Sequence, residues 1–178
     1  KVVAKGKTQY QLVLEQTPFY AESGGQVGDT GDVKFQNSNS QFQIIDTKKE
    51  NDLIIHFVES IPEDLSGEVI ATINKSNRRK IQRHHSATHL LQAALQQVLG
   101  KHIAQKGSLN NADYMRFDFS HFAKMTDEEI AQVEKIVNQK IRQNIPVVIK
   151  TMAIAEAKEM GAMALFGEKY GDVVRVVV

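Results

Sequence analysis

Residues 76–100 read SNRRKIQRHHSATHLLQAALQQVLG, and the hydrophobic periodicity of the chain changes where they begin. Thr88, Leu91 and Leu95 recur at intervals of three and four residues, the spacing of one face of an α-helix. Gly100 is the kind of residue that ends a helix. The chain before this stretch is β-prone, and the chain after it mixes helix and strand signals. We therefore expect β structure before the helix and mixed α+β structure after it.

Residues 1–74 are predicted to form a small antiparallel β-barrel. Short runs of β-branched and aromatic residues are separated by Gly, Asn, Asp and Ser, as in closely spaced antiparallel strands. The predicted strands are residues 10–14, 33–35, 42–45, 53–58 and 68–73.

Residues 75–178 are predicted to form a two-layer α+β domain, in which helices and strands alternate. After the first helix, the second helix begins at a Thr-x-x-Glu capping box, Thr126 to Glu129, and runs toward Pro146. The remaining predicted elements are strand 114–119, strand 146–151, helix 154–160 and strand 173–178. The predicted fold class is therefore α+β, an N-terminal antiparallel β-barrel followed by a two-layer α+β domain.

The composition excludes several classes of protein. The 178 residues include no cysteine, which excludes a disulfide scaffold, and the formal net charge of +1 requires any nucleic-acid contact to come from a local patch. No run is long enough to span a membrane, and the start lacks the pattern of a signal peptide. Because the chain starts at Lys1 and stops in the β-branched run 173–178, we expect a fragment of a longer polypeptide.

His85 and His89 are the strongest candidates for metal ligands. Four residues apart on a helix, they lie on one face and reach a single ion, although a tetrahedral zinc needs further ligands. Ser86 stands where a zincin has its catalytic Glu, which excludes that class. On their own, such paired histidines are as often polar surface or core residues. His84 points off this face, and His56, His102 and His121 are isolated in the sequence and are interpreted as structural.

Residues 17–31, TPFYAESGGQVGDTG, combine four glycines with polar side chains. The glycines permit tight turns and close approach to a ligand, and Thr17, Glu22, Ser23 and Gln26 offer polar groups. The stretch lacks the Gly-Lys-Ser/Thr ending of a P-loop. The glycine spacing alone favours a bulged β-hairpin.

A cluster of cations precedes the histidines. It is a candidate for contact with a nucleic-acid backbone, although charge alone favours a solvated helix face. Its members are Lys75, Arg78, Arg79, Lys80 and Arg83.

In combination, these motifs resemble the editing region of the alanyl-tRNA synthetase family, in one order and over nearly the whole chain. The residues that carry the resemblance are 17–31, 85–91 (HSATHLL), 105–109 (QKGSL), 116–121 (RFDFSH) and 161–172 (GAMALFGEKYGD).

The resemblance implies a zinc-dependent hydrolase that removes wrongly attached serine or glycine from tRNA(Ala). Within it, His85 and His89 match a His-x-x-x-His metal motif, and two further Zn²⁺ ligands, a Cys-x-x-x-His pair, are expected beyond Val178. Thr17 and Gln26 match positions that line the editing pocket. Gln26 would position water or the ester carbonyl, because an amide cannot serve as a base at neutral pH.

The resemblance also implies a parent enzyme that attaches alanine to tRNA(Ala) with ATP, the ATP being bound by the parent alone. The expected partners are tRNA(Ala), its mischarged forms and the rest of the parent chain, without a membrane, and the expected location is the cytoplasm. Arg78, Arg79, Lys80 and Arg83 are the expected tRNA contacts. Two alternatives are a freestanding deacylase that edits in trans and a tRNA-binding module without catalysis.

Overall fold

The computed structural model describes residues 2–4, 7–36, 40–62, 67–162 and 171–177. The chain divides into two compact units, Lys1–Asn138 and Gln139–Val178. The domain boundary predicted between residues 74 and 75 coincides with the start of the first helix and stays a prediction. Most of the stretch 161–172, quoted for the family resemblance, lies outside the described residues, as does the predicted strand end at Val178.

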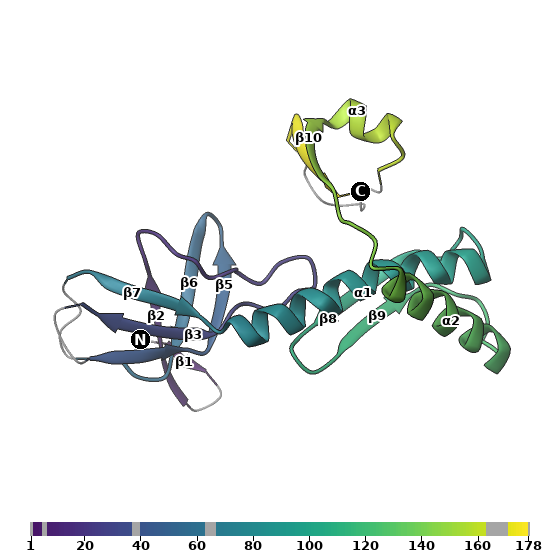
Figure 1. Ribbon diagram of the computed structural model, residues 1–178. Helices are drawn as coiled ribbons and strands as arrows, with labels where there is room; N and C mark the ends of the chain where they lie inside the picture. The colour runs from purple at the N-terminus through teal and green to yellow at the C-terminus, as the bar shows by residue number, and fades with distance from the viewer. Residues whose placement is uncertain (1, 5–6, 37–39, 63–66, 163–170, 178) are drawn as a thin grey trace. The chain divides into compact units, whose positions relative to one another are not determined.

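The first part of unit 1 is built from two antiparallel sheets (Figure 1). One has the order β1-β2-β6-β5 and the other the order β4-β3-β7. The strands are β1 (Val2–Ala4), β2 (Lys7–Val13), β3 (Gly31–Phe35), β4 (Gln41–Ile44), β5 (Asp46–Glu50), β6 (Leu53–Val58) and β7 (Val69–Ile73). The five predicted strands are thus found, but none of the sheets closes into a barrel within the described residues, so the barrel stays a prediction.

The core of these sheets follows from the alternation of side chains along a strand. In β3, Val33 and Phe35 are buried whereas Asp32 and Lys34 are exposed, because successive residues point to opposite faces. The buried cluster consists of Phe19, Val33, Phe35, Phe42, Ile44 and Val58. Each fully buried side chain of this size contributes about 1.5–3 kcal/mol relative to exposure.

Helix α1 (Lys75–Leu99) matches the predicted helix to within one residue. Asn74 caps its start by accepting a hydrogen bond from the backbone N–H of Asn77, at 3.1 Å, and Gly100 ends it with a φ of 114°. In Figure 1, α1 runs alongside the hairpin formed by β8 (Gln105–Asn110) and β9 (Met115–Phe119).

A second core lies between α1, this hairpin and helix α2 (Asp127–Gln143). Its buried members are Ala94, Leu95, Ile103 and Val133. The α+β class is therefore confirmed, with the second half of unit 1 packing its helices on one antiparallel hairpin.

Unit 2 contains the antiparallel pair β10 (Ile149–Ala153) and β11 (Val173–Val177), together with helix α3 (Ile154–Glu159). The predicted strand and helix ends agree within a few residues. None of the helices in the described residues is both long and apolar enough to cross a membrane.

Three strands were not predicted: β1, β5 and β8. β5 reads DTKKE and lies at the edge of its sheet, where exposed charged side chains are typical. β8 contains Gly107 beside an irregularity in the register, and glycine is depleted in strands. Hydrophobic alternation is absent from both.

The predicted capping box of α2 is present and yields a stability prediction. The backbone N–H of Thr126 donates to Glu129 Oε2 at 2.8 Å, and the backbone N–H of Glu129 donates to Thr126 Oγ1 at 3.2 Å. Replacing Thr126 with Ala leaves one helix donor without its acceptor, so we expect a loss of about 1 kcal/mol in the free energy of unfolding. Urea denaturation measures it, with Thr126→Ser as the control that retains the cap. Equal stability of Thr126→Ala and Thr126→Ser would contradict the prediction.

Candidate functional site

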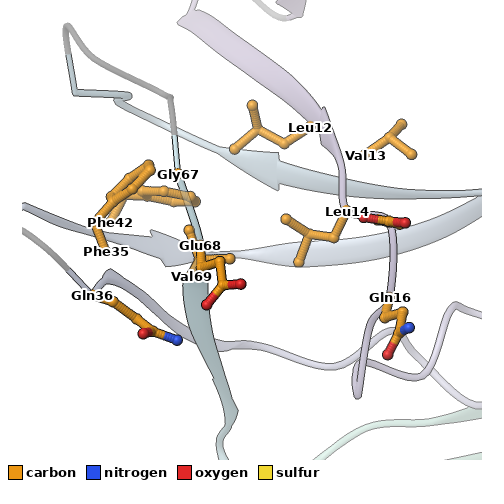
Figure 2. Close-up of a pocket in the computed structure, with 11 residues that line it drawn as sticks. Leu12, Val13, Leu14, Gln16, Phe35, Gln36, Phe42, Gly67, Glu68 and Val69 are labelled. Carbon is orange, nitrogen blue, oxygen red and sulfur yellow. The ribbon is translucent and has the colours of Figure 1, made fainter.

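A groove of about 530 Å³ opens in the β-rich part of unit 1 (Figure 2). Leu12, Phe35, Phe42 and Val69 supply apolar lining, and Glu68 borders it. None of the predicted catalytic or metal-binding residues lines this groove.

His85 and His89 lie one above the other on α1. Their ring centroids are 5.2 Å apart and the ring planes differ by 17°. The predicted placement of both imidazoles on one helix face is therefore confirmed. His84 points elsewhere, as expected, because its Nδ1 hydrogen-bonds to the carbonyl oxygen of Asn111 at 2.7 Å.

Gln26 holds the ring of His85 by a hydrogen bond across 59 residues of sequence. The Nδ1 atom of His85 lies 3.0 Å from Oε1 of the buried Gln26. Since an amide oxygen only accepts, Nδ1 carries the proton, and a neutral ring then has its lone pair on Nε2. Burial lowers the pKa of His85 below its ordinary value of 6.5, and the charge of His89 lowers it further. The ring is therefore neutral at neutral pH.

The turn that carries Gln26 depends on its glycines. Ser23 and Gln26 exchange backbone hydrogen bonds of 2.9 and 3.1 Å across Gly24 and Gly25, which have φ values of 57° and 76°. Positive φ at both central residues is typical of a type I′ hairpin turn. A Cβ on Gly25 would lie 1.9 Å from Ser108 Oγ, so β8 packs directly on the turn. The tight turn expected from the glycines is present, but the predicted bulged β-hairpin is not. Ser23 and Gln26 form only an isolated bridge, and the strands on either side of the stretch, β2 and β3, belong to different sheets. The same turn provides the contact to His85.

Asn110, the last residue of β8, joins the turn to the helix. Its backbone N–H donates to Gly25 O at 2.7 Å, and its carbonyl accepts from the N–H of Val27 at 3.1 Å. Its fully buried side chain contacts the Thr88 hydroxyl of α1 through Oδ1, at 2.7 Å, while Nδ2 has no partner within the described residues. Sequence reasoning missed Asn110, because a single asparagine in a polar segment carries no pattern.

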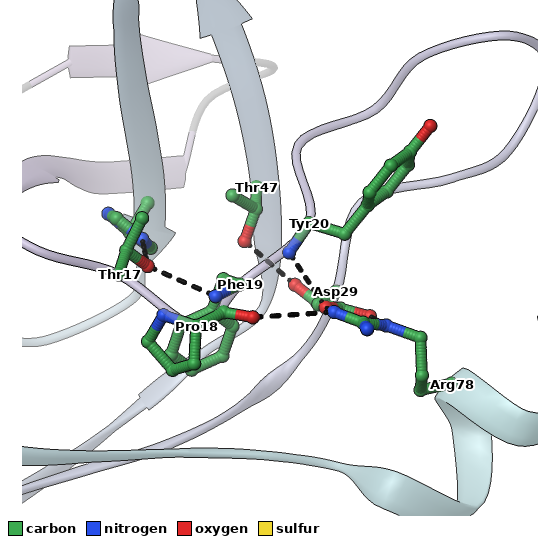
Figure 3. A network of polar contacts seen from close by, with 8 residues as sticks. Thr17, Pro18, Phe19, Tyr20, Asp29, Thr47 and Arg78 are labelled. Carbon is green, nitrogen blue, oxygen red and sulfur yellow. Dashed lines mark hydrogen bonds and ion pairs between the residues drawn. The ribbon is translucent and has the colours of Figure 1, made fainter. Parts of the chain in front are cut away.

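A second tie between the glycine-rich stretch and α1 is the ion pair of Asp29 and Arg78 (Figure 3). The Asp29 side chain is 2% exposed. Its Oδ1 accepts from Arg78 Nε at 2.7 Å, and its Oδ2 accepts from Arg78 Nη2 and, at 2.7 Å, from the backbone N–H of Tyr20. The hydrogen bond to Asp29 raises the pKa of Arg78. Arg78, an expected tRNA contact, is therefore engaged inside the protein.

Thr17 lies against His56. His56 Nδ1 is 3.1 Å from the carbonyl of Leu12 and so donates to it, which leaves Nε2 to accept from the Thr17 hydroxyl at 2.8 Å. Thr17 Oγ1 also accepts from the N–H of Phe19 at 3.1 Å. Burial lowers the pKa of His56, consistent with a neutral ring in a structural role. Among the described residues, no hydrogen bond joins Thr17 to Gln26 or His85, so its expected place in the same pocket stays a prediction.

The remaining cations, Arg79, Lys80 and Arg83, are exposed and form no ion pair within the described part of the chain. At about 100° per residue, these three side chains project to the side of α1 away from His85. Of the predicted tRNA contacts, only Arg78 shares the face of the histidines.

His102 and His121 are isolated in the sequence, but the structure brings them together. His102 Nε2 and His121 Nδ1 are 2.9 Å apart, because the ends of β8 and β9 bring the two segments together.

The donor set at His85 fits part of a metal site. A histidine whose Nδ1–H is held by an amide or carbonyl oxygen, with Nε2 free, has the arrangement typical of a metal ligand. His85 meets this description and His89 lies beside it. Within the described residues, however, no group of three or more His, Cys, Asp or Glu side chains could hold an ion. The described residues thus place two imidazoles side by side, fewer than the three protein ligands that a zinc site needs.

Residues 1–77 match the family model described as tRNA synthetases class II (A). Three relatives are named alanine–tRNA ligase: one from Cytophaga hutchinsonii is 55% identical over 99% of this chain, one from Bacteroides fragilis is 54% identical over 99%, and one from Leptospira borgpetersenii is 49% identical over 93%.

The chain belongs to the alanyl-tRNA synthetase family. The matches cover 20% of the Cytophaga and Bacteroides relatives and 18% of the Leptospira relative, so the chain spans about a fifth of their length.

The ion pair predicts a contrast between two neighbouring arginines. Arg78→Ala leaves the buried Asp29 carboxylate without its counter-charge, and we expect a loss of about 3 kcal/mol in the free energy of unfolding. Arg79→Ala, one residue along the same helix and exposed, should change stability by less than about 0.5 kcal/mol. Chemical denaturation of both variants measures the difference, and equal stabilities would count against the ion pair.

Proposed function

We propose that this chain is the editing module of an alanine–tRNA ligase. It would hydrolyse the ester that joins serine or glycine to tRNA(Ala), and the parent enzyme would attach alanine to tRNA(Ala) using ATP. The relatives' names support the ligase, and the site on α1 supports the hydrolase.

The observation that carries the proposal is the hydrogen bond from His85 to Gln26. A buried amide on a glycine turn holds a neutral imidazole whose Nε2 lone pair is free, beside a second imidazole on the next helical turn. An arrangement that only stabilised the fold would not need a stacked second histidine at this spacing. The free Nε2 lone pair suits the binding of a metal ion or of a hydrogen-bond donor of the substrate.

Chemistry explains why a ligase of this type needs a second site. Serine is alanine with an added hydroxyl, and glycine is alanine without its methyl, so one binding pocket rejects them by only about 1–3 kcal/mol. Gln26 Oε1 is occupied by His85, and the Nε2 amide has no hydrogen-bond partner within the described residues. This amide N–H would donate to the serine hydroxyl or to the ester carbonyl oxygen.

In the reaction, the oxygen of a water molecule bonds to the carbonyl carbon, the bond from that carbon to the ribose oxygen breaks, and the ribose oxygen takes a proton. His85 and His89 would hold Zn²⁺, with the remaining ligands coming from a Cys-x-x-x-His pair outside this chain. When bound, zinc polarises a carbonyl or lowers the pKa of water. Gln26 orients the His85 ring and offers its amide N–H to the substrate.

The start of α1 supports a role in holding RNA. Its first turn contains no acidic residue, although acids are the favoured residues near the positive end of a helix. Exposed cations follow at Arg79, Lys80 and Arg83. We propose that these cations contact phosphates of tRNA, with an affinity that falls steeply as salt increases.

A second candidate function is a tRNA-binding module without catalysis. It is favoured by the absence, within the described residues, of a third metal ligand near His85. The two candidates differ in a single observable, the release of serine from Ser-tRNA(Ala).

Deacylation of Ser-tRNA(Ala), measured on the gene product that contains residues 1–178 and in the presence of zinc, tests the proposal. We expect Gln26→Ala to lower kcat/KM about 10- to 100-fold, because it releases the ring of a metal-binding histidine, and His85→Ala to lower it further. His84→Asn is the matched control, because His84 hydrogen-bonds to the carbonyl oxygen of Asn111 and points away from His85. This substitution should leave the rate near that of the wild type. If the folded protein, supplied with zinc, shows no hydrolysis above background, the editing proposal is wrong. The tRNA-binding module without catalysis then remains as the function.

A further inference from the structure

Three aromatic rings form a cluster on the surface of unit 1, away from His85. The centroids of His102 and His121 are 5.2 Å apart, and both rings contact Phe122, at 4.8 and 4.7 Å. His102 stacks on His121 with planes that differ by 21°, and on Phe122 with planes that differ by 29°. We call His102, His121 and Phe122 the ring cluster.

The position of the ring cluster is fixed by the hairpin beneath it. Gln105 of β8 pairs with Phe119 of β9, and the backbone N–H of Ser120 donates to Ala104 O at 3.0 Å. The chain segments that carry His102 and His121 are therefore held side by side, and His102 Nε2 lies 2.9 Å from His121 Nδ1.

The cluster is open to solvent. Phe122 is 84% exposed although it touches two other rings, and His102 is also exposed. Exposed lysines flank the rings in sequence, Lys101 next to His102 and Lys124 two residues after Phe122. Neither lysine forms an ion pair within the described residues.

We propose that the ring cluster is a stacking platform for an unpaired nucleobase of RNA, with Lys101 and Lys124 contacting the adjacent phosphates. Unpaired RNA bases are recognised by stacking on Phe, Tyr, Trp and His side chains, and every base has a face that stacks. The flat exposed rings suit the base of a nucleotide, and the nearby unpaired cations suit its phosphate. This inference rests on the proposed tRNA-binding function and extends it to a site that the editing chemistry does not use.

The platform is separate from the proposed hydrolytic site. His85 and Leu99 both belong to α1, and at 1.5 Å per residue they are about 20 Å apart along the helix axis. His102 follows three residues after Leu99. A base on the platform is therefore not the nucleotide that bears the amino acid, but one several nucleotides away, and the platform would align the strand that leads to the site.

Binding of the 178-residue chain to two probes tests the platform: whole tRNA(Ala), and a short single-stranded RNA with the sequence of its 3′ end and a fluorescent base analogue whose emission is quenched by stacking. We expect Phe122→Leu to weaken binding of the single strand about fivefold or more and to abolish the quenching, because leucine has no ring face. Phe122→Trp should retain both. Tyr114→Leu is the matched control, since Tyr114 is 53% exposed at the other end of the same hairpin.

Three results would overturn the inference. If Phe122→Leu binds the single strand as tightly as the wild type while tRNA(Ala) still binds, the platform is absent and the proposed function stands. If the wild-type chain binds neither probe, the proposed tRNA contact and the platform both fail. If EDTA abolishes binding and zinc restores it, His102 and His121 act as metal ligands and not as stacking surfaces.

Discussion

The carboxylate of Asp29 is almost completely removed from water, and a charge in that position is tolerated only when it is paired and hydrogen-bonded. Arg78 supplies the counter-charge from the first turn of α1, and the backbone N–H of Tyr20 supplies a further donor. This pairing fixes the glycine-rich stretch to the helix. Gln26 lies three residues before Asp29, and His85 lies two helical turns after Arg78, so one ion pair brings the other two side chains within reach.

The chemical consequence is that the proton of the neutral His85 ring is held on one nitrogen, Nδ1. The turn at Gly24 and Gly25, the backbone bonds of Asn110 and the ion pair together leave Gln26 little freedom, and its amide oxygen selects the Nδ1–H form of His85. Burial keeps that ring neutral. A preorganised lone pair beside His89 is what metal binding or substrate orientation requires.

Much of this architecture was predictable because its signals are local. The helix from Lys75 to Leu99 and the capping box at Thr126 follow from periodicity and from two side chains three residues apart. The strand β5 was not predictable, since an edge strand with charged side chains carries no alternation. At the site, the spacing of His85 and His89 indicated a shared face, whereas the Gln26 bond to His85 and the pairing of His102 with His121 depend on contacts 59 and 19 residues apart. Charge alone could not separate Arg78, which is bound to Asp29, from Arg79, which is exposed.

The central claim is that Gln26 holds His85 as a neutral ring with its proton on Nδ1. Long-range nitrogen–proton NMR correlations of the ¹⁵N-labelled chain at neutral pH report the protonation of each ring nitrogen directly. We expect a protonated Nδ1 and an unprotonated Nε2 for His85, and a loss of this preference in Gln26→Ala. A His85 ring protonated on Nε2 alone, or on both nitrogens, would contradict it.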